Sequence, residues 1–207
     1  MEDVPEVHRR PHDPERPVVR LDETSRQPVG EVRGPLPPGP GETARYDGEC
    51  GRTGTADVPL AFEPSAGWRQ VRVTDRRRRR DRAAFVEDLA DGPYAGAART
   101  APVMARPDTH TPASPYEAFP PEEAKRPADR LEIHRTPEHG SWLTMAGIEL
   151  GALARHLPER VGDGAASERH VTAREHRRNA ARAEADRRFT TADARVKLRK
   201  LHPSSQA

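Results

Sequence analysis

Residues 134–150 read His-Arg-Thr-Pro-Glu-His-Gly-Ser-Trp-Leu-Thr-Met-Ala-Gly-Ile-Glu-Leu, and this stretch leads from a loop into a helix. From Met145 to Leu157 the apolar side chains recur at helical spacing, and Pro158 ends the pattern because proline cannot continue a helix. Gly147 and Gly151 lie inside this segment, and each costs about 1 kcal/mol relative to alanine in a helix interior. We predict a helix over residues 145–157 in spite of that cost.

The segments before this helix predict mainly strands. Val18 to Leu21 is a short strand that ends at Asp22 and Glu23, and two further runs flank a turn over 63–67 and predict a hairpin. Pro102 lies inside another strand candidate, where it removes a donor from the hydrogen-bond ladder. Strands followed by mixed strands and helices favour one α/β domain. The predicted strands are 18–21, 55–62, 68–73, 99–104 and 131–135, and the other predicted helices are 81–90, 165–188 and 191–201.

Two regions stand apart from this pattern. Residues 1–16 are polar and rich in proline, so we expect a flexible tail. The helix over 165–188 has almost no large apolar side chains, so we expect it to be solvated or marginal. The last helix has a clearer start, because Thr190 and Asp193 form a capping-box pattern.

Composition limits the core and the cell compartment. The chain has 207 residues, of which only 33% are hydrophobic, together with 22 prolines and 15 glycines, so we expect a thin core that folds incompletely if further weakened. Cys50 is the single cysteine, which excludes an internal disulfide. No signal peptide and no apolar run long enough to span a membrane are present, so we expect a cytoplasmic protein.

Several motifs together resemble the catalytic domain of DDE-type insertion-sequence transposases related to the Tc/mariner superfamily. The resemblance extends over residues 17–204 and implies a ribonuclease-H-like mixed sheet flanked by helices. Family members carry helix-turn-helix modules before this domain, and we expect those modules to be absent here. The matching stretches are 16–23, 53–56, 60–64, 67–69, 103–104 with 109–112, 140–147 and 188–195.

The resemblance implies three converging acids that hold Mg²⁺ or Mn²⁺ for DNA cleavage and strand transfer. Asp22 occupies the first position and is the expected metal ligand. Ala105 stands where the family has its second acid, and Gly147 stands where it has its third. Cleavage of a phosphodiester by two metals needs carboxylate oxygens, so the resemblance also implies an inactive enzyme.

Nearby acids offer two alternatives. Asp108 lies three residues beyond Ala105, which is about 10 Å of extended chain and too far without rebuilding. Glu149 lies two residues beyond Gly147, a rotation of about 200° around a helix, so it should face away. A register shifted by two residues would instead make Glu149 the third acid.

Other candidate sites are less specific. Arg76 to Arg80 are five consecutive arginines, which fit either DNA phosphates or a solvated loop. His110, His134 and His139 lack the close spacing of a zinc site. Arginine also has G/C-rich codons, so coding bias explains much of the arginine excess.

Three hypotheses follow for function. The chain is a truncated, decayed transposase catalytic domain; or it is a non-catalytic protein that binds DNA or pairs with intact transposase subunits and inhibits them; or it is mostly unfolded and has no function. DNA is the expected partner in the first two, and intact transposase subunits are a further partner in the second.

Overall fold

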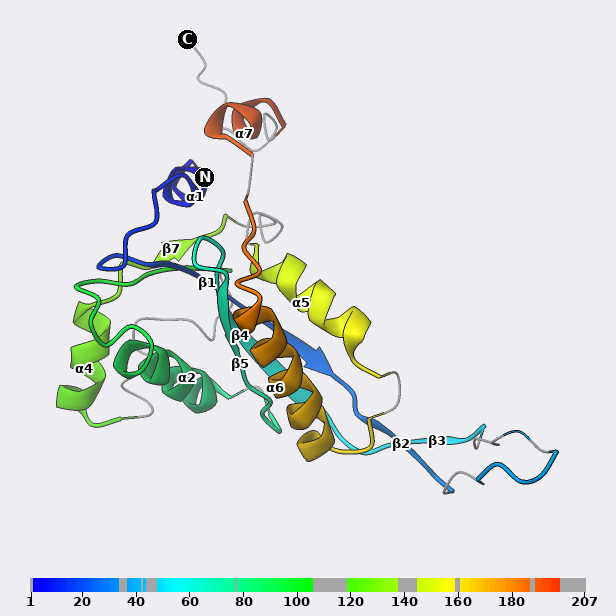
Figure 1. The fold of residues 1–207 in the computed structure, drawn as a ribbon. Helices are drawn as coiled ribbons and strands as arrows, with labels where there is room; N and C mark the ends of the chain where they lie inside the picture. The colour runs from blue at the N-terminus through cyan, green and yellow to red at the C-terminus, as the bar shows by residue number, and fades with distance from the viewer. Residues whose placement is uncertain are drawn as a thin grey trace, which may run out of the picture.

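The computed structural model describes residues 2–33, 37–41, 43, 48–76, 78–105, 119–137, 145–158, 161–186 and 189–197 (Figure 1). Strands dominate the first half of the chain and helices the second. In chain order the elements are α1 (Asp3–His8), β1 (Val18–Arg26), β2 (Val29–Glu31), β3 (Cys50–Arg52), β4 (Ala56–Glu63), β5 (Trp68–Val71), α2 (Arg79–Asp91), β6 (Ala101–Met104), α4 (Pro121–Asp129), β7 (His134–Arg135), α5 (Ala146–His156), α6 (Gly164–Ala180) and α7 (Thr191–Lys197).

A five-stranded mixed sheet forms the centre of the fold, with the strand order β5-β4-β1-β6-β7. β4 pairs antiparallel with both β1 and β5, while β6 runs parallel to β1 and to β7. Every residue of β4 is buried. This arrangement confirms the predicted ribonuclease-H-like α/β fold, in which a mixed sheet is flanked by helices.

Helices cover both faces of the sheet, and β1 supplies side chains to each face in alternation (Figure 1). Val19 and Leu21 pack with Phe85 and Leu89 of α2 on one face. On the opposite face, α5 and α6 lie against β4, where Leu153 of α5 and Val171 of α6 contact Val58. Asp22 follows Leu21, so the alternation directs it to the face that α5 covers.

β1 is longer than the sequence predicts. The strand continues through Asp22 and Glu23 to Arg26, because β4 supplies pairing partners as far as Ala56 opposite Arg26. Asp22 therefore lies within a paired strand and not at its end. Pro102 also lies within a strand, β6, in spite of its missing donor.

The segment 1–16 differs from the flexible tail that its composition predicts. Residues Asp3–His8 form α1, and Val4 and Val7, three residues apart on one helix face, are 0% and 1% exposed. They pack with Val18, Ala101 and Val103 at the sheet. Pro5 between them is buried as well, so one apolar face docks this short helix.

The later helices agree in part with the sequence. α5 lies within the predicted 145–157 range, and the capping box before α7 is confirmed, since the Thr190 backbone N–H donates to Asp193 Oδ2 at 2.8 Å and the Asp193 N–H donates to Thr190 Oγ1 at 3.2 Å. The predicted end of the last helix, 198–201, lies outside the described residues. α4 and the β2–β3 pair were not predicted.

Within the described chain, no helix has the length and apolarity needed to span a membrane.

The turn between β4 and β5 contacts the segment that follows α6. Gly67 has a φ of +62°, and a Cβ added there would lie 2.5 Å from the backbone carbon of Arg182. The Ala185 N–H donates to the Pro64 carbonyl at 3.2 Å. Only a residue without a side chain fits this close approach of two backbone segments.

We expect Gly67→Ala to lower the free energy of unfolding by more than about 2 kcal/mol, because it adds strain at a positive φ to a collision with backbone atoms. Gly39→Ala is the matched control, since a Cβ at Gly39 meets nothing within 4 Å. Urea unfolding followed by circular dichroism measures both. Equal stability of the two variants would contradict the close contact.

Candidate active site

Asp22 and Gly147 lie next to each other across the gap between β1 and α5. A Cβ built on Gly147 would lie 3.6 Å from Asp22 Oδ2. The other carboxylate oxygen, Oδ1, accepts a hydrogen bond from the Glu23 backbone N–H at 2.9 Å. Gly147 is exposed and Asp22 is half-buried, so solvent reaches this point of the fold. A side chain at position 147 would point at the Asp22 carboxylate.

The parallel pairing of β1 with β6 places Ala105 close by. Leu21 is paired with Met104; Asp22 is the next residue of β1, and Ala105 directly follows the end of β6. The fold thus gathers positions 22, 105 and 147 from a first strand, the end of a central strand and a helix. Asp22 is the single carboxylate among those three positions.

Glu149, the alternative third acid, is 5% exposed and is held by two arginines. Its Oε1 and Oε2 accept from Arg178 Nε and Nη2 at 2.6 and 2.8 Å, in a bidentate pair. Oε1 also lies 3.1 Å from Arg69 Nε. A carboxylate with both oxygens engaged in this way ties α5 to α6 and β5.

Arg69 is the centre of that buried cluster, and its side chain is 1% exposed. Its Nη2 donates to the Ala183 carbonyl at 2.6 Å, and its Nη1 donates to Asn179 Oδ1 at 3.2 Å. The guanidinium also lies over the Phe62 ring, 5.0 Å from the ring centre. Burial lowers the pKa of Arg69, while the Glu149 carboxylate acts to raise it.

The same cluster explains how α6 docks although it lacks a large apolar face. Glu175 accepts from the Val71 N–H at 2.7 Å, and Asn179 donates to the Arg69 carbonyl at 2.7 Å. Burial raises the pKa of Glu175, and its hydrogen bond from Val71 opposes that shift. The helix predicted to be solvated or marginal therefore packs on β5 through polar side chains, with only Ser167 and Val171 fully buried.

Glu23, the acid beside Asp22, has a different role. The alternation of β1 directs it to the other face of the sheet, where it pairs with Arg82 of α2. Both side chains are almost fully buried. Glu23 is therefore no substitute for a missing acid beside Asp22.

The other candidate residues do not gather at Asp22. His134 contacts Asp3 and Glu132 through its two ring nitrogens, at 2.9 and 3.0 Å, which links α1 to β7. Asp108, His110 and His139 lie outside the described residues. Sequence reasoning missed Arg69 and Arg178, because nothing in the local pattern distinguishes a buried arginine from an exposed one.

The profile of the family described as DDE superfamily endonuclease matches residues 17–163. That match covers more than half of the chain and includes positions 22, 105 and 147. The chain belongs to the DDE superfamily. A search of curated proteins finds no match.

Solved structures of the Mos1 transposase also match the chain. The "Mos1 Strand Transfer Complex" has 12% identity and a TM-score of 0.40, covering 82% of this chain and 56% of that chain. The "Mos1 mariner paired end complex with Mn" has 12% identity and a TM-score of 0.31, covering 90% of this chain and 63% of that one. This chain spans less than two thirds of the length of these structures.

The donor set at this site does not fit the divalent metal that the superfamily implies. Mg²⁺ prefers carboxylate oxygens, and the side chains of Ala105 and Gly147 supply none. Across the described part of the chain, no group of three His, Cys, Asp or Glu side chains could hold a metal ion. Asp22 is left as the single acid facing Gly147.

We expect Glu149→Gln to lower the free energy of unfolding by about 3 kcal/mol, because it leaves the buried charge of Arg69 uncompensated. Chemical denaturation measures the change. Glu168→Gln is the matched control, since Glu168 is exposed on α6, and we expect a change within about 0.5 kcal/mol. A near-neutral Glu149→Gln would show that the Glu149 carboxylate does not hold α5 in place.

Proposed function

We propose that this chain is a DDE endonuclease domain that retains the fold of the superfamily but has lost metal-dependent DNA strand cleavage. The observation that supports this most directly is the 3.6 Å approach of a Gly147 Cβ to Asp22 Oδ2. This approach supports position 147 as the one from which a third acid would share a metal with the first. The helix register that would make Glu149 the third acid finds no support, because Arg69 and Arg178 occupy that carboxylate.

Loss of the acids is sufficient to abolish the chemistry. Strand cleavage with two metals needs one metal to activate the attacking oxygen and another to stabilise the leaving oxygen. Each 1.36 kcal/mol added to the barrier lowers the rate tenfold. With two of three acids missing, positions 22, 105 and 147 together supply only one carboxylate to a metal. The nominal activity of the ancestral domain, DNA cleavage and strand transfer in transposition, is therefore absent from the natural chain.

A non-catalytic role in binding DNA is the second candidate, and exposed arginines favour it. Arg169 and Arg177 of α6 are exposed, and no carboxylate in the described part of the chain pairs with them. Pairing with intact transposase subunits, and so inhibiting them, would use the same retained fold. Neither DNA binding nor pairing with transposase subunits requires a metal.

We expect the double reversion Ala105→Asp with Gly147→Glu to nick supercoiled DNA with Mn²⁺ at least about 100-fold faster than the natural chain, since it restores both missing acids. Adding Asp22→Ala to the reversion should abolish the gain. Gel separation of supercoiled and nicked plasmid measures the rate. Nicking by the natural chain that is lost with Asp22→Ala would contradict the proposal.

Folding of the variants needs its own control. Thermal melts by circular dichroism establish that each variant unfolds cooperatively, and calorimetric titration with Mn²⁺ reports on the metal site without DNA. The double reversion should bind Mn²⁺ more tightly than the natural chain, and Asp22→Ala should remove the difference. A folded reversion that binds Mn²⁺ no better than the natural chain would show that the three positions do not form a metal site.

A further inference from the structure

β5 is the edge strand at one side of the sheet, and α6 lies along the edge that β4 leaves open (Figure 1). In an antiparallel pair, alternate residues direct their N–H and C=O groups away from the neighbouring strand. The Arg72 N–H donates inward, to the Pro59 carbonyl of β4 at 3.1 Å. By this alternation, Arg69 and Val71 direct their backbone groups outward, where another strand could pair with them.

Two side chains of α6 occupy the place of a sixth strand at this edge. The Asn179 side-chain amide accepts from the Arg69 backbone N–H at 2.9 Å and donates to the Arg69 carbonyl at 2.7 Å. These are the two kinds of hydrogen bond that a paired residue of an antiparallel strand would exchange. Glu175 Oε2 accepts from the Val71 N–H at 2.7 Å. Side chains of a helix therefore satisfy backbone groups that a strand would otherwise bind.

The repeats of the two elements explain why a helix fits here. Four residues of an α-helix advance about 6 Å along its axis, and two residues of an antiparallel strand advance about 6.8 Å. Glu175 and Asn179 are four residues apart on one helix face, and their backbone partners in β5 are two residues apart. The next residue of this row, Val171, belongs to the cluster against which Val73 packs. α6 therefore runs antiparallel to β5, with one helical turn for each outward-facing residue.

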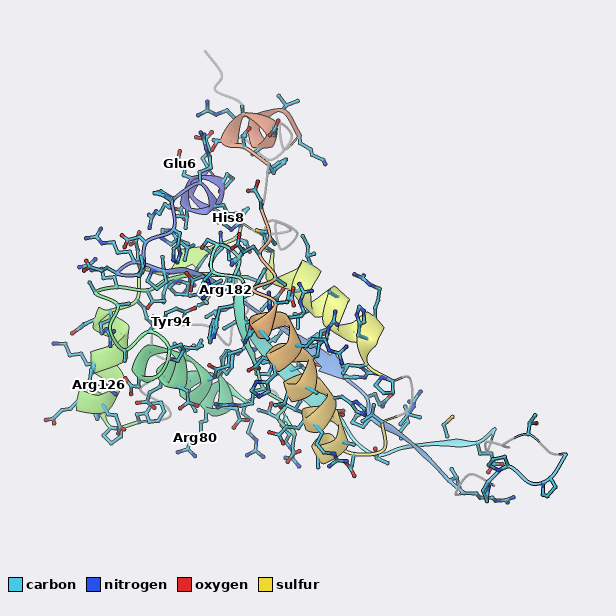
Figure 2. All side chains as sticks on the ribbon, viewed as in Figure 1. Glu6, His8, Arg80, Tyr94, Arg126 and Arg182 are labelled. Atoms are coloured by element: carbon cyan, nitrogen blue, oxygen red, sulfur yellow. The ribbon has the colours of Figure 1, made fainter. Side chains whose placement is uncertain are left out.

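Contacts beyond the strand hold both ends of α6 in this position. Past its C-terminal end, Arg182, labelled in Figure 2, meets the turn before β5, where a Cβ added to Gly67 would lie 2.5 Å from the Arg182 backbone carbon. At the other end, a Cβ on Gly164 would lie 3.6 Å from Asp75 Oδ1. All of α6 is described, and two of its residues are fully buried. Polar contacts thus contribute much of what keeps the helix on this edge.

We propose that α6 acts as a surrogate edge strand, which blocks β5 from pairing with β5 of a second copy of this chain. A two-fold antiparallel pairing centred on Gln70 would place Arg69 of each copy opposite Val71 of the other, so both outward-facing residues would lie in hydrogen-bonded pairs. Within residues 68–72, this register places no two arginines directly opposite each other. The inference goes beyond the proposed function, because it involves neither DNA nor a metal.

Hydrogen exchange of the natural chain, followed by NMR, gives the first test. The Arg69 and Val71 amides should exchange at least about 100-fold more slowly than amides of an unfolded peptide, because side chains of α6 accept both protons. The Arg72 amide, which bonds to β4, is the internal reference. Fast exchange at Arg69 and Val71 beside a protected Arg72 would overturn the surrogate strand.

The double variant Glu175→Ala, Asn179→Ala removes the surrogate and should self-associate. In sedimentation velocity its mass should rise to about twice that of the natural chain as the protein concentration increases from about 1 to 100 µM. Adding Val71→Pro should reverse the association, because proline lacks the outward N–H that pairing uses. Association that Val71→Pro leaves unchanged would overturn pairing through β5, as would a cooperatively folded double variant with the mass of the natural chain.

The matched control is Glu168→Ala, Thr172→Ala, which removes one acid and one uncharged polar side chain from exposed positions of the same helix. It should have the mass of the natural chain, and equal association of the two double variants would contradict a specific role for the β5 contacts. Asn179→Asp is a milder variant for the case that the double variant does not fold. It keeps an acceptor for the Arg69 N–H and loses the donor to the Arg69 carbonyl, so it should also associate. If Asn179→Asp folds and has the mass of the natural chain at about 100 µM, the proposal fails.

Discussion

The buried guanidinium of Arg69 is the interaction on which the arrangement of α5 and α6 depends. A charge that is 1% exposed is tolerated only when carboxylates, carbonyls or π faces surround it. Glu149 from α5, Asn179 and the Ala183 carbonyl meet that need. Because Glu149 lies on α5 while Asn179 and Ala183 lie at the end of α6, satisfying Arg69 also fixes where α5 lies over β1. The approach of Gly147 to Asp22 is a consequence of that placement.

Sequence patterns predicted the elements that carry a local signal. β4 and β5 followed from alternation and the intervening turn, α5 from its apolar spacing, and the start of α7 from Thr190 and Asp193. The patterns failed where polar contacts or distant partners decide the structure. α1 is docked by two valines, the buried Pro5 and the contact of Asp3 with His134. α6 is docked largely by Glu175, Arg178 and Asn179. No local pattern records that an arginine such as Arg69 is buried. The family resemblance, and no local pattern, singled out positions 22, 105 and 147. Ala105 and Gly147 carry no functional group that a pattern could identify.

Arginine compensates for a thin apolar core in this chain. Arg130 donates to the carbonyls of Tyr94, Ala95 and Ala97, at 2.7, 3.0 and 2.7 Å, and so closes the loop after α2. Arg195 forms a bidentate pair with Glu2, which joins α7 to the N-terminus. A guanidinium with five donors can satisfy several acceptors at once, so one residue replaces several apolar contacts. Part of the arginine excess therefore has a structural effect.

The two acids that we propose to be missing, at positions 105 and 147, are those that the fold does not need. Three carboxylates that converge without a metal repel one another, so replacing two of them by alanine and glycine removes a source of instability. Gly147 is exposed, and its nearest neighbour across the gap is an Asp22 oxygen at 3.6 Å, so no packing contact was lost there. Glu149 lies two residues from Gly147 and Glu23 lies one residue from Asp22, and both are held by arginines whose buried charges require them. Under the proposed loss of cleavage, the acids that the fold binds are present, and the acids that only the chemistry requires are missing.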